Sequence, residues 1–263
     1  MKKIFLSLMK GSVLPVISSQ LRGLYLKAGP LFSFSLFWRN AEPEKHYVYK
    51  LLVRENDVVF DVGANVGLHS YYFSKNFKSI QVFAFEPQPE NISFIKETIS
   101  RNKLKNIELV DCALGAKEGE IYFDTASNNS QGFITETETG LKVKVDTLDH
   151  FITSRNLFPK LIKVDVEGAE SQVLEGFKNS IEKISPILVI ELHTPENDRA
   201  VSSFFQNYDY TIFRLNGLKE CEQGKPFQKI KNLNATWPDP EGIWGNIIAV
   251  PASRLHEVNN YVA

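Results

Sequence analysis

The side chains best suited to chemistry in this sequence are four carboxylates and one imidazole that each follow an apolar run. Glu86 ends one run, Asp165 and Glu167 follow a second, and Glu191 and His193 end a third. Carboxylates can accept hydrogen bonds from sugar hydroxyls or bind a cation, and a neutral imidazole can accept a proton. The pattern therefore predicts a site that binds a hydroxyl-bearing ligand and removes a proton from it.

A glycine-rich turn precedes these residues. The apolar run Val58–Val62 leads into a turn that contains Gly63, Asn65 and Gly67. Glycine lets a backbone approach a ligand closely, and the helix N-terminus that should follow offers unpaired N–H groups. A dinucleotide fingerprint needs Gly-x-Gly-x-x-Gly, whereas Asn65 and Leu68 occupy its second and third glycine positions. The turn argues against NAD or FAD, although a tight turn without any ligand would use the same glycines.

The ends of the second and third expected strands carry further candidates for cofactor binding. Glu86, followed by Pro87, comes about two dozen residues after the glycine turn, where an acid can accept both hydroxyls of a ribose. Asp111 and Cys112 follow the next strand, from which a side chain could reach an adenine edge. They could equally be a turn acid beside a small buried thiol.

Asp165, Glu191 and His193 are the candidate catalytic residues. His193 could act as a general base towards a substrate hydroxyl, or be an ordinary hydrogen-bonded histidine at a strand end. A Mg²⁺ ion could instead orient the hydroxyl, with Asp165, Glu167 or Glu191 as oxygen ligands. The spacing does not require a metal, so metal dependence stays open. Glu170 lies in a first helical turn, where capping alone would explain it.

The elements that must position these residues alternate between apolar runs and stretches of helical period from residue 57 onward. This alternation is typical of βαβ units and predicts a Rossmann-like α/β fold with a mostly parallel sheet and helices on both faces. The expected strands are 58–62, 80–85, 107–110, 161–164, 187–191 and 210–214, and the expected helices are 66–77, 89–102, 169–180 and 196–208.

Two further regions complete the expected sheet. Weaker strands at 120–123 and 141–145 flank a polar stretch, 125–140, which we interpret as a hairpin or a mobile loop. The apolar run 244–250, ended by a proline, is expected to close the sheet as an antiparallel edge strand.

The chain is expected to divide into an N-terminal helical extension (1–54), one catalytic domain (55–252) and a short tail (253–263). The aromatic segment 14–38 is expected to cover the core or the substrate, with peripheral contact to a membrane as the alternative. The mostly apolar stretch that follows the two N-terminal lysines is only six residues long, which is short for an export signal. The sequence has no apolar run long enough to span a bilayer.

Charge and cysteine content narrow the class of protein. Thirty basic residues against 31 acidic ones give a net charge of -1, which argues against a nucleic-acid partner. The 2 cysteines lack the spacing of metal ligands or of a disulfide framework, which favours a reducing, cytoplasmic setting. The oligomeric state cannot be read from the sequence.

Taken together, several separate motifs resemble the FkbM family of S-adenosylmethionine (SAM)-dependent methyltransferases, over roughly residues 57–250. The resemblance implies the seven-stranded class I methyltransferase fold, with SAM above the carboxyl ends of the strands and O-methyl transfer as the usual activity. By position it implies that the turn from Asp61 to Gly67 borders the methionine part of SAM, that Glu86 holds the ribose, and that Asp165 lies near the methyl group. The matching segments are 60–67, 84–91, 113–115 with 119, 145–149, 161–170 with 174 and 176, and 191–193.

The expected acceptor is a hydroxyl of a small molecule or a glycan. Methyltransferases that act on the amino groups of DNA or RNA commonly carry Asp/Asn-Pro-Pro-aromatic after the fourth strand, where this chain has Asp165-Val-Glu-Gly. Two alternatives stay open: an NAD-dependent oxidoreductase on a similar sheet, and a non-catalytic protein that binds SAM. The acceptor itself cannot be read from the sequence.

Overall fold

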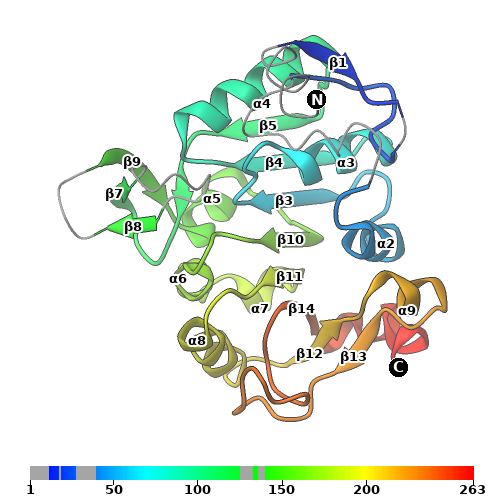
Figure 1. Ribbon diagram of the computed structural model, residues 1–263. Coiled ribbons are helices and arrows are strands. Elements are labelled where there is room, and N and C mark those ends of the chain that lie inside the picture. Colours follow the sequence, from blue (N-terminus) through cyan, green and yellow to red (C-terminus); the bar gives the residue numbers. More distant parts are fainter. Residues whose placement is uncertain (1–11, 18, 28–39, 125–132, 136–139) are drawn as a thin grey trace, which may run out of the picture.

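The computed structural model describes residues 12–17, 19–27, 40–124, 133–135 and 140–263. Within these residues the chain forms a central eight-stranded sheet, a second sheet of four strands and a two-stranded N-terminal hairpin. Helices cover both faces of the central sheet (Figure 1). The expected α/β architecture is confirmed.

The central sheet has the order β13-β12-β14-β11-β10-β3-β4-β5. The five strands from β11 to β5 run parallel, and their carboxyl ends are in register, since Val164 pairs with both Val62 and Ile190, and Val62 pairs with Phe85. The residues that follow these strands therefore meet along one rim. The strands are β3 (Val58–Val62), β4 (Gln81–Phe85), β5 (Ile107–Val110), β10 (Leu161–Val164), β11 (Ile187–Glu191), β12 (Tyr210–Leu215), β13 (Phe227–Lys229) and β14 (Asn246–Pro251).

One expectation about this sheet is wrong. Strand β14 is antiparallel, as expected, but it lies between β11 and β12 rather than at the edge. Four successive residues of β14, from Ile247 to Val250, are buried, so both faces of the strand are covered. A continuous apolar run of this kind is typical of an interior strand. The short β13 takes the edge instead, and it is an eighth strand beyond the seven expected.

Alternating side chains of the strands pack into two cores. Val59 and Val82 join the core beneath α2, α3, α4 and α9, whereas Phe60 and Phe83 join the core beneath α5 to α8, where they contact Phe151. The helices are α2 (Pro43–Leu52), α3 (Leu68–Asn76), α4 (Pro89–Asn102), α5 (Leu148–Arg155), α6 (Glu170–Glu175), α7 (Ile181–Ile184), α8 (Pro195–Phe205) and α9 (Leu218–Glu222).

Two helices differ from expectation. The expected helix 169–180 is shorter than predicted, since α6 ends at Glu175 and α7 begins only at Ile181. The residue after α6 is Gly176, where a Cβ atom would lie 2.0 Å from the carbonyl oxygen of Gly115. Helix α5 was not expected, although its N-cap, Thr147, accepts a hydrogen bond from the backbone N–H of His150. A Ser or Thr before an apolar stretch is a usual helix-start signal.

The second sheet contains the expected hairpin. Strand β7 (Gly119–Asp124) pairs antiparallel with β9 (Leu141–Asp146), and the sheet also contains β6 (Ala113–Leu114) and β8 (Phe133–Thr135), in the order β6-β9-β7-β8. In Figure 1 it stands beside the end of the central sheet at which β3 points. Of the polar stretch 125–140, residues 125–132 and 136–139 lie outside the described residues.

The described parts of the N-terminal region pack against the domain. Strands β1 (Val13–Pro15) and β2 (Tyr25–Lys27) form a hairpin, and the Tyr25 backbone N–H donates to Asn102 of α4. Residues 1–11, 18 and 28–39 lie outside the described residues, so the expected domain boundaries stay predictions. At the C-terminus, short 3-10 turns at Ala252–Glu257 and Asn259–Tyr261 close the chain. Among the described residues, no helix is long and apolar enough to cross a membrane.

Candidate active site

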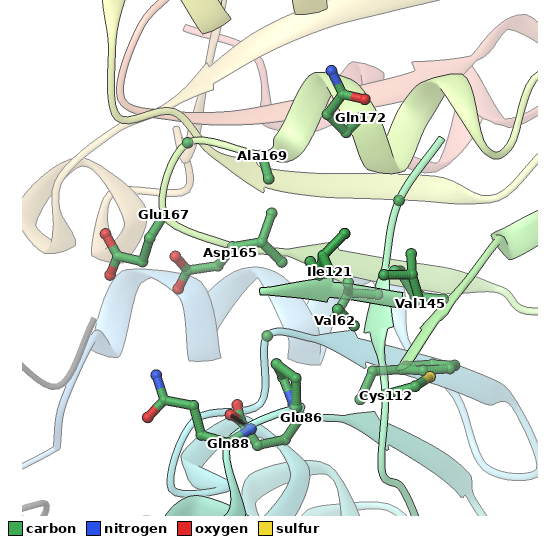
Figure 2. A pocket seen from close by; sticks show the side chains of 18 of the residues that line it. Val62, Glu86, Gln88, Cys112, Ile121, Val145, Asp165, Glu167, Ala169 and Gln172 are labelled. Carbon is green, nitrogen blue, oxygen red and sulfur yellow. Dashed lines mark hydrogen bonds between the residues drawn. The ribbon is translucent and has the colours of Figure 1, made fainter. Parts of the chain in front are cut away.

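A cavity of about 650 Å³ lies over the carboxyl ends of β3, β4 and β10. Its walls are the turn after β3, residues 86–88 and Asn91 after β4, residues 112–117 after β5, the second sheet, and the turn after β10 with Gln172 of α6. Figure 2 shows Asp165 and Glu167 together at one end and Ile121, Val145 and Cys112 at the other. The cavity thus joins a polar end to an apolar end.

The glycine turn after β3 needs glycine for two separate reasons. Gly63 has φ +74°, and a Cβ atom there would lie 1.9 Å from the carbonyl oxygen of Asp165. Gly67, with φ +83°, caps α3, and its Cβ would lie 2.6 Å from the Tyr71 ring. Gly63 and Asn65 line the cavity, as expected for cofactor binding, whereas the structure does not bring Gly67 to it.

Asp61 is fully buried beneath the turn rather than facing the cavity. Its Oδ2 accepts a 2.6 Å hydrogen bond from the Ser70 hydroxyl, and its Oδ1 lies 3.1 Å from Nζ of Lys163. The strand alternation points this side chain into the protein. Asp61 therefore supports the turn from below.

Glu86 is the best-organised carboxylate of the cavity. Only 4% of the residue is exposed, yet it lines the cavity. Its Oε2 accepts from the Asn65 backbone N–H at 2.8 Å, and its Oε1 accepts from the Gln88 backbone N–H at 2.9 Å and from Asn91 Nδ2 at 3.2 Å. Burial raises the pKa of Glu86 to about 7, although the bonds from Gln88, Asn91 and Asn65 act in the opposite direction.

Asn91 adds an unused acceptor beside Glu86. The residue is 2% exposed and lines the cavity, and its Oδ1 has no hydrogen-bond partner among the described residues. A buried polar atom without a partner in a native protein requires an explanation, such as a ligand. Together, Glu86 and Asn91 offer acceptor atoms suited to hydroxyl groups.

Glu170 holds the turn after β10 in place. The residue is fully buried, and its Oε1 accepts from the backbone N–H groups of Val166 (3.2 Å) and Gly168 (3.1 Å) and lies 3.0 Å from His193 Nδ1. Its Oε2 accepts from Asn197. Glu170 therefore does more than cap a helix, because its carboxylate fixes the loop that carries Asp165 and Glu167.

His193 lies among three carboxylates. Its Nε2 is 3.5 Å from Asp165 and 3.3 Å from Glu167, and its Nδ1 faces Glu170. The hydrogen bond to Glu170, together with the charges of the three acids, raises the pKa of His193 to about 9, against the effect of burial. At pH 7 the ring is therefore an imidazolium, which donates protons and cannot accept one. This state does not suit the general-base role expected from the sequence.

Glu191 is held by an ion pair with the N-terminal region rather than lining the cavity. Lys45 of α2, 1% exposed, contacts both Glu191 and Glu42. His69 Nε2 lies 3.3 Å from Glu42. The ion pairs attach the first turn of α2 to the rim of the sheet.

Of the two candidate residues after β5, Cys112 lines the cavity and Asp111 faces the solvent. Cys112 lines the cavity, where burial raises the pKa of its thiol to about 12. The Asp111 carboxylate is 47% exposed and pairs with Lys96 at 2.7 Å, and the structure does not bring it to the cavity. Pro87 lines the cavity beside Glu86.

Sequence reasoning missed most of the apolar wall. Ile121 of β7 and Val145 of β9 reach the cavity from the second sheet, and Gln172 reaches it from α6. Gln88 and Asn91 were also missed, although they follow Glu86 within the same turn and helix start. Contacts from the second sheet have no signal in local sequence, whereas Gln88 and Asn91 could have been found by their nearness to Glu86.

The interior antiparallel strand β14, the parallel strands β11 to β5 and the cavity at their carboxyl ends define the class I methyltransferase fold. The sequence model of the methyltransferase FkbM domain matches residues 61–212. The chain belongs to the FkbM family and is a methyltransferase, which confirms the resemblance read from its motifs.

Two relatives carry informative names. The hexuronic acid methyltransferase AglP of Haloferax volcanii is 30% identical over 168 residues, which cover 62% of this chain and 68% of the relative. The 2-O-methyltransferase NoeI of Sinorhizobium fredii is 26% identical over 191 residues, which cover 61% of this chain and 78% of the relative.

A solved structure supports the fold. The methyltransferase FkbM of Methylobacillus flagellatus superposes with a TM-score of 0.51 and 19% identity. The match covers 78% of this chain and 47% of that chain, so this protein corresponds to about half of the solved one.

Proposed function

We propose that this methyltransferase transfers a methyl group from SAM to a hydroxyl of a sugar-containing acceptor. The observation that carries the proposal is the buried Glu86 carboxylate, which lines a cavity beside the unpartnered Oδ1 of Asn91. The names of the two relatives, which specify a hexuronic acid and a 2-O position, support a sugar as the acceptor.

The residues of the cavity fit SAM along its length. Glu86 and Asn91 would hold the ribose hydroxyls, and the apolar side chains of Ile121 and Val145 would contact the adenine. The turn at Gly63 and the carboxylate of Asp165 would border the methionine end. When bound, SAM supplies the methyl group by in-line displacement at its sulfonium.

The carboxylates after β10 are the groups that this chain offers to the acceptor. Asp165 and Glu167 lie at the polar end of the cavity, where either carboxylate can accept the proton of an acceptor hydroxyl. The His193 imidazolium lies between them and fixes their orientation. Much of the rate is then expected from positioning of the hydroxyl, because proximity alone supplies a large part of such barriers.

The acceptor is expected to enter on the side of α2. The ion pairs of Lys45 attach this helix to Glu191 on the rim, next to the carboxylates. Helix α2 would therefore form part of the acceptor site. Cys112 and Cys221 are free and buried, which suits a cytoplasmic protein.

Labelled SAM offered with neutral hexose and hexuronic acid acceptors tests the proposed reaction. We expect the label to enter a methyl ether, which survives mild alkali, on both acceptor types. Label that is released by mild alkali would come from a methyl ester and would overturn the assignment of a hydroxyl acceptor. Transfer to none of these sugars would overturn the assignment of a sugar acceptor.

Methyl transfer is expected to be independent of metal. Asp165, Glu167 and His193 offer ligand atoms within 4.8 Å of one another, a spacing that a cation such as Mg²⁺ could use. With the pKa of His193 at about 9, a proton occupies the ring nitrogen at neutral pH and would have to leave before a metal could bind. We expect EDTA or added Mg²⁺ to change the initial rate by less than about twofold. Loss of activity in EDTA, restored by Mg²⁺ or Mn²⁺, would contradict this.

The affinity for S-adenosylhomocysteine, the demethylated product of SAM, is expected to fall in acid. The ionised Glu86 can accept hydroxyl hydrogen bonds with both oxygens, whereas protonation turns one oxygen into a donor. Its pKa of about 7 means that Glu86 is protonated in the free protein below that pH. The affinity should be maximal above pH 7 and fall about tenfold for each pH unit below it. Calorimetry on wild type and Glu86→Gln checks this, since the variant should bind more weakly and with little pH dependence. If Glu86→Gln kept the wild-type dependence of affinity on pH, a group other than Glu86 would be responsible for it.

A further inference from the structure

A buried lysine occupies the middle of the parallel sheet. Lys163 lies in β10 between Ile162 and Val164, with β3 on one side and β11 on the other, and is 2% exposed. Burying an ammonium group is costly unless it is paired and hydrogen-bonded. The surrounding groups must therefore satisfy its charge.

Three oxygen atoms surround the ammonium group of Lys163. Lys163 Nζ donates to the carbonyl oxygen of Gly63 at 2.9 Å, and it lies 3.1 Å from Asp61 Oδ1 and 3.5 Å from Asp165 Oδ2. Gly63 and Asp165 belong to different turns, and both line the cavity. One side chain therefore connects the turn after β3 to the turn after β10.

We propose that Lys163 is a positioning residue, which holds the glycine turn and the Asp165 carboxylate in the arrangement that binds the methyl donor. The inference rests on the proposed function. Gly63 already packs directly on the backbone of Asp165, so the lysine adds a charged link to a steric one. The side chain lies below the turns and holds the groups that touch the ligand.

The charge of Lys163 also affects Asp165. Burial is the largest single influence and would raise the pKa of Asp165, but the positive charges of Lys163, Lys45 and His193 together outweigh it, so that the pKa is lowered. Asp165 is therefore a carboxylate across the working pH range and can face a cationic ligand. Without the lysine, Asp165 should titrate at a higher pH.

Two variants test the inference. Lys163→Met removes the charge, and Asp61→Asn/Lys163→Met removes it together with its buried partner, which avoids an uncompensated Asp61 if the single variant does not fold. At pH 8 we expect both to bind S-adenosylhomocysteine at least about tenfold more weakly than wild type. Carbon-13 NMR of the aspartate carboxyl groups should show a pKa for Asp165 raised by about one unit or more.

Ile162→Ala is the matched control, because it removes packing from the same strand without touching these contacts. It should lower the melting temperature but leave the affinity and the Asp165 pKa close to wild type. Folded lysine variants that match wild type in both readouts would overturn the inference, as would equal loss of affinity in Ile162→Ala. Wild-type protein that binds no S-adenosylhomocysteine would instead overturn the proposed function, and this inference with it.

Discussion

Glu86→Ala is expected to weaken the binding of S-adenosylhomocysteine by about 100-fold. Hydrogen bonds to a charged group contribute about 1.5–3 kcal/mol each, so the loss of two ribose contacts costs about 3 kcal/mol or more. The substitution also leaves the N–H groups of Asn65 and Gln88 without their acceptor in the cavity wall. Isothermal titration calorimetry at pH 8 measures the affinity.

Glu90→Ala is the matched control for this prediction. Glu90 lies four residues further along the chain, in the first turn of α4, and is exposed. The control should bind S-adenosylhomocysteine like wild type. A folded Glu86→Ala protein with undiminished affinity would mean that the ribose is held elsewhere.

Gly63→Ala is expected to destabilise the protein and to abolish detectable cofactor binding. A Cβ atom at this position would overlap the carbonyl oxygen of Asp165, and φ +74° costs an alanine about 1–2 kcal/mol in addition. The turns after β3 and β10 would have to separate, so the free energy of unfolding should fall by more than about 3 kcal/mol in total. In a thermal unfolding scan the melting temperature should fall by roughly 6 °C or more.

Gly168→Ala separates backbone strain from the overlap. Gly168 also lines the cavity and has φ +104°, but a Cβ atom there would have nothing within 4 Å. Backbone strain alone should lower the free energy of unfolding of this variant by about 1–2 kcal/mol, and the variant should retain measurable cofactor binding. Equal effects of the two substitutions would show that contact between the turns is not what makes Gly63 necessary.

The strands and the position of Glu86 in the cavity wall could be predicted because their signals are local. Apolar runs such as Val58–Val62 mark interior parallel strands, and the register of those strands brings Glu86 and Asp165 to one rim whatever the loops do. The position of β14 was misjudged because a proline at its end was given more weight than its apolar character on both faces.

The surroundings of Asp61, Asp111 and His193 could not be predicted, because they depend on contacts with residues distant in the sequence. Asp61 and Asp111 carry the right chemistry, but Lys163 pairs with the first inside the protein and Lys96 pairs with the second at the surface. The protonation of His193 follows from the buried Glu170, which lies 23 residues before it. No local pattern reports such pairings.

Titration of the wild-type protein with S-adenosylhomocysteine, run beside NADH in the same calorimeter, tests the central claim most directly. The cavity predicts saturable binding of one S-adenosylhomocysteine per chain and no binding of NADH, because the glycine turn lacks the second and third glycines of a dinucleotide site. Binding of NADH, or no binding of S-adenosylhomocysteine, would contradict the assignment of this cavity to a methyl donor.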